Sequence, residues 1–193
     1  MKEINIYDFD GTIYRGDSSI DFWKFCIKKK PIILKRIPIQ VTALILNKFS
    51  ILNTTKFKSI FFTFLKDFNE LEIENNIDLF WQSKKNKFEK WFVNREKHCY
   101  EIVISASPYF LLNKICRFYH IDKIIATEMD YNGQIHGENC KGEQKVVRLN
   151  QNIDDYIINE FYSDCISDLP LAKLSKTAFI IKNGKKEKWE IQS

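Results

Sequence analysis

Two acidic residues follow the first apolar run of the chain, in the stretch "IYDFDGT" (residues 6–12). Asp8 and Asp10 are two positions apart, so on an extended backbone both side chains point to one face, where their charges repel. A cation between them would offset this repulsion, and hard oxygen ligands favour Mg²⁺. Gly11 lets the backbone turn sharply and approach an anion closely. Two ordinary turn acids are the alternative; the pattern favours a site for a metal ion and a phosphate group.

Later segments carry residue types that suit the same chemistry. Ser105 ends the apolar run "EIVIS", Lys141 opens "KGEQK", and two acids, Asp164 and Asp168, lie in "YSDCISD". A hydroxyl and an ammonium group can bind phosphoryl oxygens, and a further carboxylate can complete a cation site. These residues are therefore candidates for a site shared with the first two acids.

Each candidate also has an ordinary interpretation. Ser105 could be a helix cap, and Ser107 competes for either role. Sequence spacing does not separate Lys141 from Lys145, and whichever lies outside the site would be a solvated surface lysine. The two later acids could be a turn acid and a helix cap, and Asp17 is interpreted as a cap rather than a substrate contact.

Apolar runs and turn signals predict the strands that would bring these residues together. We expect strands at 2–7, 101–105, 123–129 and 158–164, and a hairpin around Asn183-Gly184. Helical patterns separate most of these strands. Such alternation predicts an α/β fold, a Rossmann-like doubly wound parallel sheet, in which ligands bind at the carboxyl ends of the strands.

The stretch between the first two strands is almost wholly helical in pattern. One apolar stripe recurs at helical spacing from Phe57 to Phe68. We therefore expect a catalytic core of residues 1–16 and 98–193, with an all-α cap of residues 17–97 inserted after the first strand. Caps of this kind exclude water and select the substrate.

Composition restricts the class of protein. The 193 residues carry a net charge of +5, a mild basic excess that suits an anionic substrate and gives no reason to expect a specific nucleic acid partner. Five widely spaced cysteines form no CxxC or Cys/His cluster, which favours reduced thiols. No signal peptide or membrane span is evident, so we expect a cytoplasmic protein. Nothing in the sequence indicates an oligomeric state.

In order along the chain, these motifs resemble those of the haloacid dehalogenase superfamily of phosphotransferases. "DFDGT" resembles its first motif, Ser105 its second, Lys141 its third, and Asp164 with Asp168 its fourth. "ISASP", "CKGEQK" and "YSDCISDLP" further resemble the phosphoserine-phosphatase-like branch. Ser163 departs from the pattern, because many members have glycine there.

The resemblance implies a role for each matching residue. Asp8 would be the nucleophile that forms an aspartyl-phosphate, and Asp10 the general acid and base. Mg²⁺ would bind the Asp8 carboxylate, the Asp10 carbonyl and Asp164. Asp168 would orient the metal shell or the motif lysine. The phosphoryl group would be bound by Gly11, Thr12, Ser105, Ala106 and Lys141, with Lys141 also catalytic through its charge on the nucleophile.

A mostly apolar segment with basic flanks, residues 28–49, lies inside the expected cap. It is too short and too charged to span a membrane, but it suits a segment that lies on an anionic membrane surface, at the inner face. The alternative is a buried cap helix with basic ends. In composition this cap resembles that of bacterial phosphatidylglycerophosphate phosphatases of the same superfamily, which act on a phosphomonoester head group.

These features predict a Mg²⁺-dependent phosphomonoester hydrolase acting on a soluble or lipid-linked phosphate. A phosphomutase is a variant in which the same intermediate passes to a second hydroxyl. A glycosyltransferase with Asp-x-Asp as its metal clamp would leave Gly11, Ser105 and Asp164 unexplained. A non-catalytic membrane or nucleic-acid binding protein on the same fold is the remaining alternative.

Overall fold

A six-stranded sheet forms the centre of the computed structural model, which describes residues 1–191. The strand order is β3-β2-β1-β4-β5-β6, and all neighbouring strands are parallel except β5 and β6. The strands are β1 (Lys2–Tyr7), β2 (Tyr100–Pro108), β3 (Lys123–Thr127), β4 (Tyr156–Ser163), β5 (Ser175–Lys182) and β6 (Lys185–Lys188). The predicted doubly wound α/β fold is confirmed.

The order of the strands creates a switch point at the carboxyl end of β1. From β1 the chain runs outward to β2 and β3, and it then returns to the other side of β1 for β4 and β5. At such a point the connections leave in opposite directions and open a crevice above the strand ends. The first and fourth motifs, after β1 and β4, therefore lie side by side.

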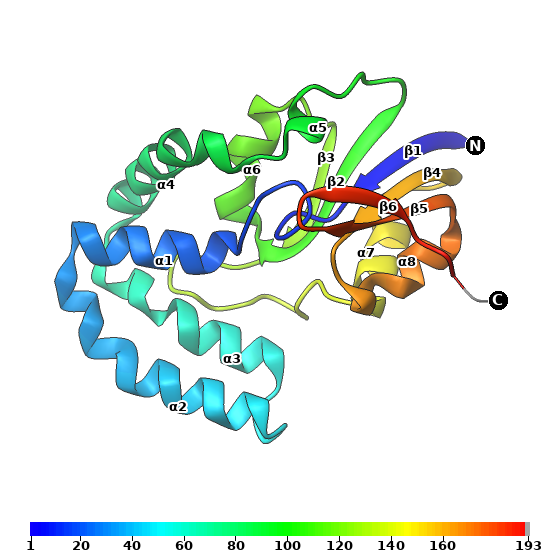
Figure 1. The fold of residues 1–193 in the computed structure, drawn as a ribbon. Coiled ribbons are helices and arrows are strands. Elements are labelled where there is room, and N and C mark those ends of the chain that lie inside the picture. Colours follow the sequence, from blue (N-terminus) through cyan, green and yellow to red (C-terminus); the bar gives the residue numbers. More distant parts are fainter. Residues whose placement is uncertain (192–193) are drawn as a thin grey trace.

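Helices cover both faces of the sheet (Figure 1). On β2, Val103 packs into the core shared with α6 and the inserted helices, whereas Ile102 and Ile104 pack into the core shared with α7 and α8. Successive side chains of a strand point to opposite faces, so both faces of this central strand are apolar. The covering helices are α6 (Tyr109–Phe118), α7 (Glu143–Asn152) and α8 (Leu169–Leu174), with a 3₁₀ turn, η4 (Ile166–Asp168).

All remaining helices lie between β1 and β2 and form the insertion. They are α1 (Ser18–Lys29), η1 (Pro31–Arg36), α2 (Ile37–Lys48), α3 (Thr54–Phe61), η2 (Phe62–Asp67), α4 (Glu70–Lys84), η3 (Lys85–Lys87) and α5 (Lys90–Val93). The apolar stripe that begins at Phe57 is split between α3 and η2. A 3₁₀ turn places residues three apart above one another, which buries Phe62 and Leu65 together.

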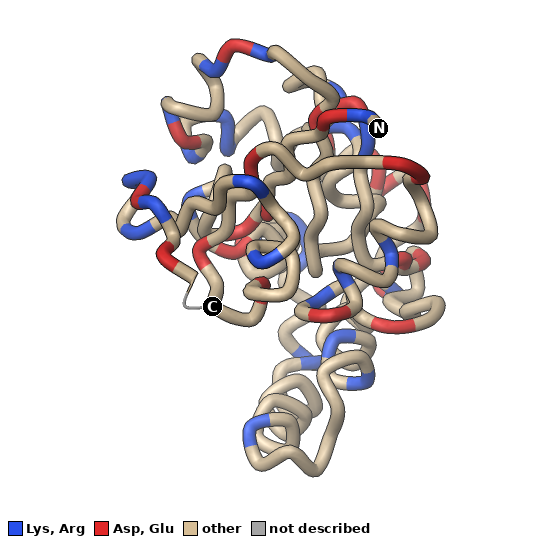
Figure 2. The backbone as a smooth tube through the Cα atoms, turned by 90° about the vertical axis from the view of Figure 1, so that its right-hand side faces the viewer, with Lys and Arg blue, Asp and Glu red and all other residues tan. Residues whose placement is uncertain are grey.

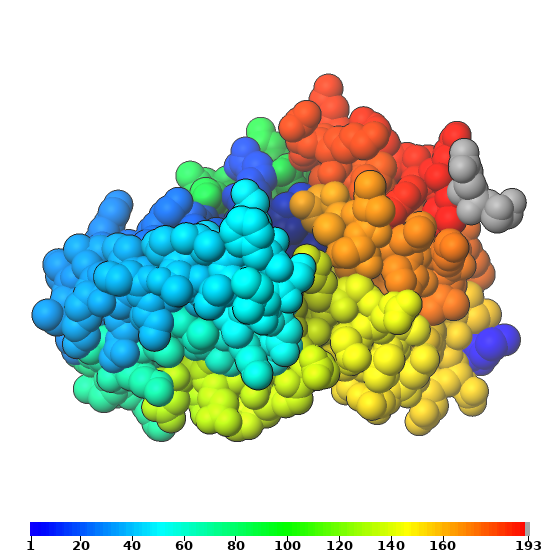
Figure 3. All heavy atoms as spheres, turned by 90° about the horizontal axis from the view of Figure 1, so that it is seen from below, coloured from blue at the N-terminus to red at the C-terminus, as the bar shows by residue number. Residues whose placement is uncertain are grey.

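The α2–α3 pair projects from the rest of the molecule (Figure 2). From below, the insertion (blue to cyan) meets the later part of the chain, in yellow-green and orange (Figure 3). This arrangement places the insertion beside the carboxyl ends of the strands, where the sequence motifs gather.

Candidate active site

The loop after β1 holds two acids on one side and a buried ring between them. Asp8 continues the strand and donates its backbone N–H to the Tyr162 carbonyl of β4, at 2.8 Å. Phe9 is fully buried and packs edge-on against Trp81 and Phe88 of the insertion. Because the ring is fixed on the insertion side, the Asp8 and Asp10 carboxylates are left to face the crevice.

Asp8 is buried in contact with a lysine and a threonine. Lys145 Nζ donates to Asp8 Oδ1 at 2.7 Å, and Thr12 Oγ1 lies 3.3 Å from Asp8 Oδ2. Burial raises the pKa of Asp8 to about 6, and the Lys145 charge opposes that rise. The carboxylate is thus held in a fixed orientation by one cation and one hydroxyl group.

Lys145, on α7, also contacts Asp168, and all three side chains are buried. Lys145 Nζ donates to Asp168 Oδ2 at 2.6 Å, and Ser163 Oγ donates to the same oxygen at 2.8 Å. Ser163 therefore supplies a hydrogen bond that a glycine at this position could not make. Asp168 orients the lysine rather than capping the following helix with its side chain.

The expectation that Lys141 balances the charge of Asp8 is corrected by this arrangement. Lys145 lies one helical turn further along and points inward from α7, whereas Lys141 precedes the helix and is exposed. Lys141 nevertheless lines the cavity described below. Both lysines therefore line the cavity, but only Lys145 is buried in contact with the Asp8 and Asp168 carboxylates.

Asp164 packs directly over Gly11. A Cβ atom at Gly11 would lie 2.0 Å from Asp164 Oδ2, and Gly11 has a φ of +73°, so only glycine fits both the space and the backbone. Asp164 donates its backbone N–H to Thr12 Oγ1 at 3.0 Å, and this hydroxyl lies 3.4 Å from Asp164 Oδ1. Partial burial raises the pKa of Asp164, with Asp168 adding to the rise.

The hydroxyl groups at the end of β2 form the other wall. Ser105 Oγ accepts a hydrogen bond from the Ser107 backbone N–H at 3.1 Å, and α6 has no side-chain cap, so Ser105 does not cap it. The Ala106 carbonyl accepts hydrogen bonds from Thr127 Oγ1 and Lys58 Nζ, both at 2.7 Å. Ser105 and Ala106 are therefore fixed at the edge of the crevice.

Asp10 is held between the core and the first helix of the insertion. Ser107 Oγ donates to Asp10 Oδ2, and the Ser18 backbone N–H, at the start of α1, donates to Asp10 Oδ1 at 2.6 Å. Burial raises the pKa of Asp10 to about 7, and the nearby Asp17 charge adds to the rise. Asp17 itself caps α1 by accepting from the Ile20 backbone N–H at 2.9 Å, as its sequence position predicts.

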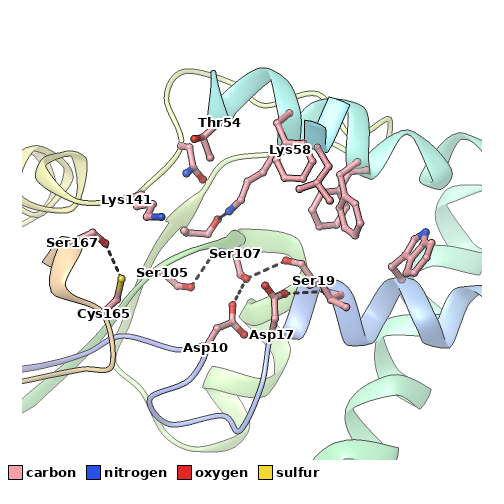
Figure 4. A pocket seen from close by; sticks show the side chains of 18 of the residues that line it. Asp10, Asp17, Ser19, Thr54, Lys58, Ser105, Ser107, Lys141, Cys165 and Ser167 are labelled. Carbon is pink, nitrogen blue, oxygen red and sulfur yellow. Dashed lines mark hydrogen bonds between the residues drawn. The ribbon is translucent and has the colours of Figure 1, made fainter. Parts of the chain in front are cut away.

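These groups surround one end of a cavity of about 570 Å³. Figure 4 shows Asp10, Ser105, Ser107 and Lys141 on its core side, with Lys58 reaching in from the insertion. The other end is lined by apolar side chains of the insertion, which are Ile20, Trp23, Ile37, Val41, Leu44, Phe57, Phe61 and Phe62. The cavity is therefore polar where the motifs meet and apolar beneath α2 and α3.

Lys58 is a cavity residue that the sequence analysis did not single out. Its pKa is lowered to about 8 because burial disfavours the charged form, while Asp10 and Asp17 oppose that effect. Thr54, Lys58, Phe61 and Phe62 follow helical spacing and all line the cavity, but the spacing alone does not show that this side of the helix faces a cavity.

The donor set suits a hard cation. Asp8 and Asp168 contact one buried ammonium group, and the charge of Asp164 lies nearby. This leaves an excess of negative charge, and the available donors are oxygens. Among residues 1–191, no three His, Cys, Asp or Glu side chains converge as a complete metal site. A cation would therefore need backbone oxygen, water or phosphate as further ligands, as Mg²⁺ commonly has.

Comparisons with known proteins identify the family of the chain. A family model described as haloacid dehalogenase-like hydrolase matches residues 6–173. A histidinol-phosphatase from Neisseria meningitidis serogroup C (strain 8013) is 29% identical over 110 residues, which are 47% of this chain and 50% of that relative. The chain thus matches about half the length of that protein.

Solved structures are similar in fold. A protein of unknown function from Bordetella pertussis Tohama I has a TM-score of 0.79 at 20% identity, with 92% of this chain and 89% of that one covered. A phosphoserine phosphohydrolase-like protein from Francisella tularensis subsp. tularensis SCHU S4 has a TM-score of 0.52 at 18% identity, with 92% and 86% covered. The family model spans most of the sequence, and the chain accordingly belongs to the haloacid dehalogenase-like hydrolases.

Proposed function

We propose that the protein is a Mg²⁺-dependent phosphomonoester hydrolase that forms an aspartyl-phosphate on Asp8. The observation that carries this proposal is the fixed Asp8 carboxylate, which is held by Lys145 at 2.7 Å at a strand end beside a cavity. A second acid, Asp10, lines the same cavity with a pKa of about 7. This pairing of a fixed nucleophile with an acid that can gain or lose a proton suits a two-step transfer.

In the first step an Asp8 oxygen attacks phosphorus, a new O–P bond forms, and the bond from phosphorus to the leaving alkoxide breaks. Protonated Asp10 gives its proton to that alkoxide. In the second step ionised Asp10 takes a proton from water, the resulting hydroxide attacks phosphorus, and the Asp8–phosphate bond breaks. The products are an alcohol and inorganic phosphate, and both acids return to their starting states.

The remaining residues at the polar end would bind and orient. The Asp8 carboxylate, the Asp10 carbonyl and Asp164 would hold Mg²⁺, which offsets the repulsion between the carboxylates and the phosphate when it is bound. Gly11, Thr12, Ser105, Ala106 and Lys141 would bind phosphoryl oxygens, and Lys145 would balance the charge on Asp8.

Lys58 is a positively charged side chain that the insertion contributes to the cavity. Its ammonium group lies against the Ala106 carbonyl at the carboxyl end of β2. In its charged form it would attract an anionic ester and draw α3 toward the core. We assign it a role in binding substrate rather than in bond breaking.

The apolar end of the cavity suits an ester whose alcohol portion carries apolar groups at a distance from the phosphate, such as a lipid-linked phosphate of the phosphatidylglycerophosphate type. Aromatic and aliphatic side chains, among them Trp23, Phe57 and Phe61, line this end. Burying apolar groups there favours such an alcohol by about 25 cal/mol for each Å² removed from water.

The test is phosphate release with Mg²⁺ from phosphatidylglycerophosphate in mixed micelles, compared with phosphoserine and histidinol phosphate. Asp8→Asn serves as the blank, with circular dichroism as the check on folding. We expect release from the wild type alone and a preference for the lipid. Full activity in Asp8→Asn would refute the mechanism, whereas turnover of soluble esters only would refute the lipid substrate.

A further inference from the structure

Helix α2 leaves most of its apolar side chains exposed while it buries a glutamine. Its buried residues are Gln40 and Ala43, while Ile39 and Ile45 are 54% and 51% exposed. Gln40 Nε2 donates to the Phe61 carbonyl at 2.8 Å, which ties the polar side inward onto α3. A helix in water normally buries its apolar stripe. The outward side of α2 therefore needs another partner.

The exposed apolar residues of α2 and of the turn that follows it are together called the α2 face. The α2 face extends beyond the end of the helix. It consists of several exposed apolar side chains, whereas single exposed apolar residues are common on any protein surface. Its members, each about half exposed or more, are Ile39, Val41, Leu44, Ile45, Phe49 and Ile51.

The segment that carries the α2 face is basic in sequence, and the exposed acid Glu138 of a later loop lies against its edge at Thr55. Between Asp21 and Asp67 the sequence has ten Lys or Arg residues and no Asp or Glu. Three of them form ion pairs with acids of α4 or η2, and Lys58 is turned into the cavity. Exposed Lys48 and Lys56 remain at the α2–α3 turn, and in Figure 2 the projecting hairpin carries blue but no red. An anionic surface complements this charge.

The α2 face is continuous with the cavity. Val41 and Leu44 belong to the face and also line the apolar end of the cavity, whose other end holds Asp8 and Asp10. An amphiphile embedded in a layer against α2 would therefore have an apolar path toward the acids.

We infer that the α2 face docks on the surface of an anionic lipid bilayer. Within residues 1–191, none of the helices meets the length and hydropathy of a membrane span. In the inferred arrangement, α2 would lie in the plane of the interface with its basic flanks on anionic head groups. A second copy fits less well, because a two-fold contact would bring like-charged flanks together. The delivery of substrate from the bilayer rests on the proposed function, whereas the docking itself does not.

The experiment is flotation of the full chain with vesicles of phosphatidylcholine alone or mixed with phosphatidylglycerol. Wild type is compared with Ile39→Ser/Ile45→Ser, two residues of the face that do not line the cavity. Leu71→Ser/Leu79→Ser on α4, where the exposed fractions are 68% and 45%, is the matched control. We expect the α2 variant to bind the mixed vesicles at least about tenfold more weakly, because buried aliphatic groups supply much of the affinity of an interfacial helix.

The control variant should bind as the wild type does, and phosphatidylcholine alone should bind weakly. Equal binding by both variants, no binding of the wild type to the mixed vesicles, or a wild-type dimer that only the α2 variant dissociates would each overturn the inference. Hydrolysis of p-nitrophenyl phosphate is measured in parallel. If that activity is absent while docking persists, the proposed function fails and the docking stands. If activity is normal in every variant and docking is absent, the docking fails and the proposed function stands.

Discussion

Lys145 Nζ lies 2.7 Å from Asp8 Oδ1, so the α7 lysine and the first acid after β1 form a buried ion pair. The same nitrogen contacts Asp168 at 2.6 Å. The Lys145 ammonium group thus pairs with two carboxylates. A third carboxylate, that of Asp164, lies close enough to raise the pKa of Asp8. Because negative charges outnumber positive ones, the site should accept a further cation, and with that cation in place it should accept an anionic substrate.

Replacing Lys145 should affect both stability and activity. In Lys145→Met two buried carboxylates lose their shared cation, and breaking a buried pair typically costs about 3–5 kcal/mol. We expect a lower urea midpoint and a loss of phosphate release of at least about 100-fold. Lys141→Met is the matched control, since this exposed lysine should raise KM and leave the urea midpoint unchanged. The reverse pattern would mean that Lys141 is the functional lysine.

Gly11→Ala should displace Asp164. The new Cβ would lie 2.0 Å from Asp164 Oδ2, and a positive φ adds about 1–2 kcal/mol of backbone strain for a non-glycine residue. Gly137→Ala is a control for that strain, because Gly137 has a φ of +83° but its nearest neighbour would be Arg148 Nη2 at 3.9 Å. We expect both variants to lose stability by thermal unfolding and only Gly11→Ala to lose most of its activity and its response to Mg²⁺. Equal activity in the two variants would contradict the packing of Asp164 on Gly11.

Lys58 should make substrate binding weaker at basic pH. Its pKa is lowered to about 8 by burial, so the cation is present below that pH and lost as the pH rises through it. We expect KM for p-nitrophenyl phosphate to rise above about pH 8 in the wild type, and Lys58→Arg to remove the rise because arginine stays charged. Lys58→Met should show a high KM at every pH. A pH-independent KM in the wild type would exclude this role.

The same shift makes a prediction for stability. Between about pH 8 and the ordinary lysine pKa, the unfolded chain binds more protons at this position than the folded chain. The contribution of Lys58 to the free energy of unfolding should therefore become more favourable as pH rises through that window. Comparing urea unfolding of wild type and Lys58→Met at several pH values isolates the contribution.

Removing the metal should lower thermal stability as well as activity. Binding of Mg²⁺ at about 100 times its Kd would add about 2.7 kcal/mol to the folded state, which is several degrees of Tm for a chain of this size. We expect chelation to lower Tm and abolish phosphate release, and Mg²⁺ to restore both. Asp164→Asn should lose the Mg²⁺ shift in Tm, whereas Asp154→Asn, an exposed acid in the loop before β4, should keep it. An unchanged shift in Asp164→Asn would remove this residue from the proposed metal site.

Much of the framework could be predicted from local patterns. The strand Lys2–Tyr7, the Asp17 cap and the hairpin at Asn183-Gly184 depend on short-range signals, and all are present. The choice between Lys141 and Lys145 depends on where α7 begins, because Gly142 precedes the helix and a lysine in the first turn points inward. Helix starts are set by capping and packing together, and the sequence there offers no strong side-chain cap.

Lys58 could not be assigned from the sequence for a different reason. Helical spacing places it on the same side as Phe61, but the sequence does not indicate that this side faces a cavity instead of a closed core. The exposure of apolar side chains on α2 has a related cause. Its apolar residues surround most of the helix, so the sequence does not show which side packs inward, and the burial of Gln40 depends on the Phe61 carbonyl of α3. Both features become visible only when α2, α3 and the sheet are placed together.

Phe9 has a consequence for how this protein could diversify. The ring sits between the two acids in sequence, and in space it belongs to an aromatic cluster with Tyr14, Trp81 and Phe88. The insertion is therefore not an accessory that could be exchanged or trimmed while the core is left intact. Any new set of helices in its place would have to provide aromatic contacts for the Phe9 ring. Without such contacts the loop would no longer be fixed, and the Asp8 and Asp10 side chains would no longer be directed into the crevice.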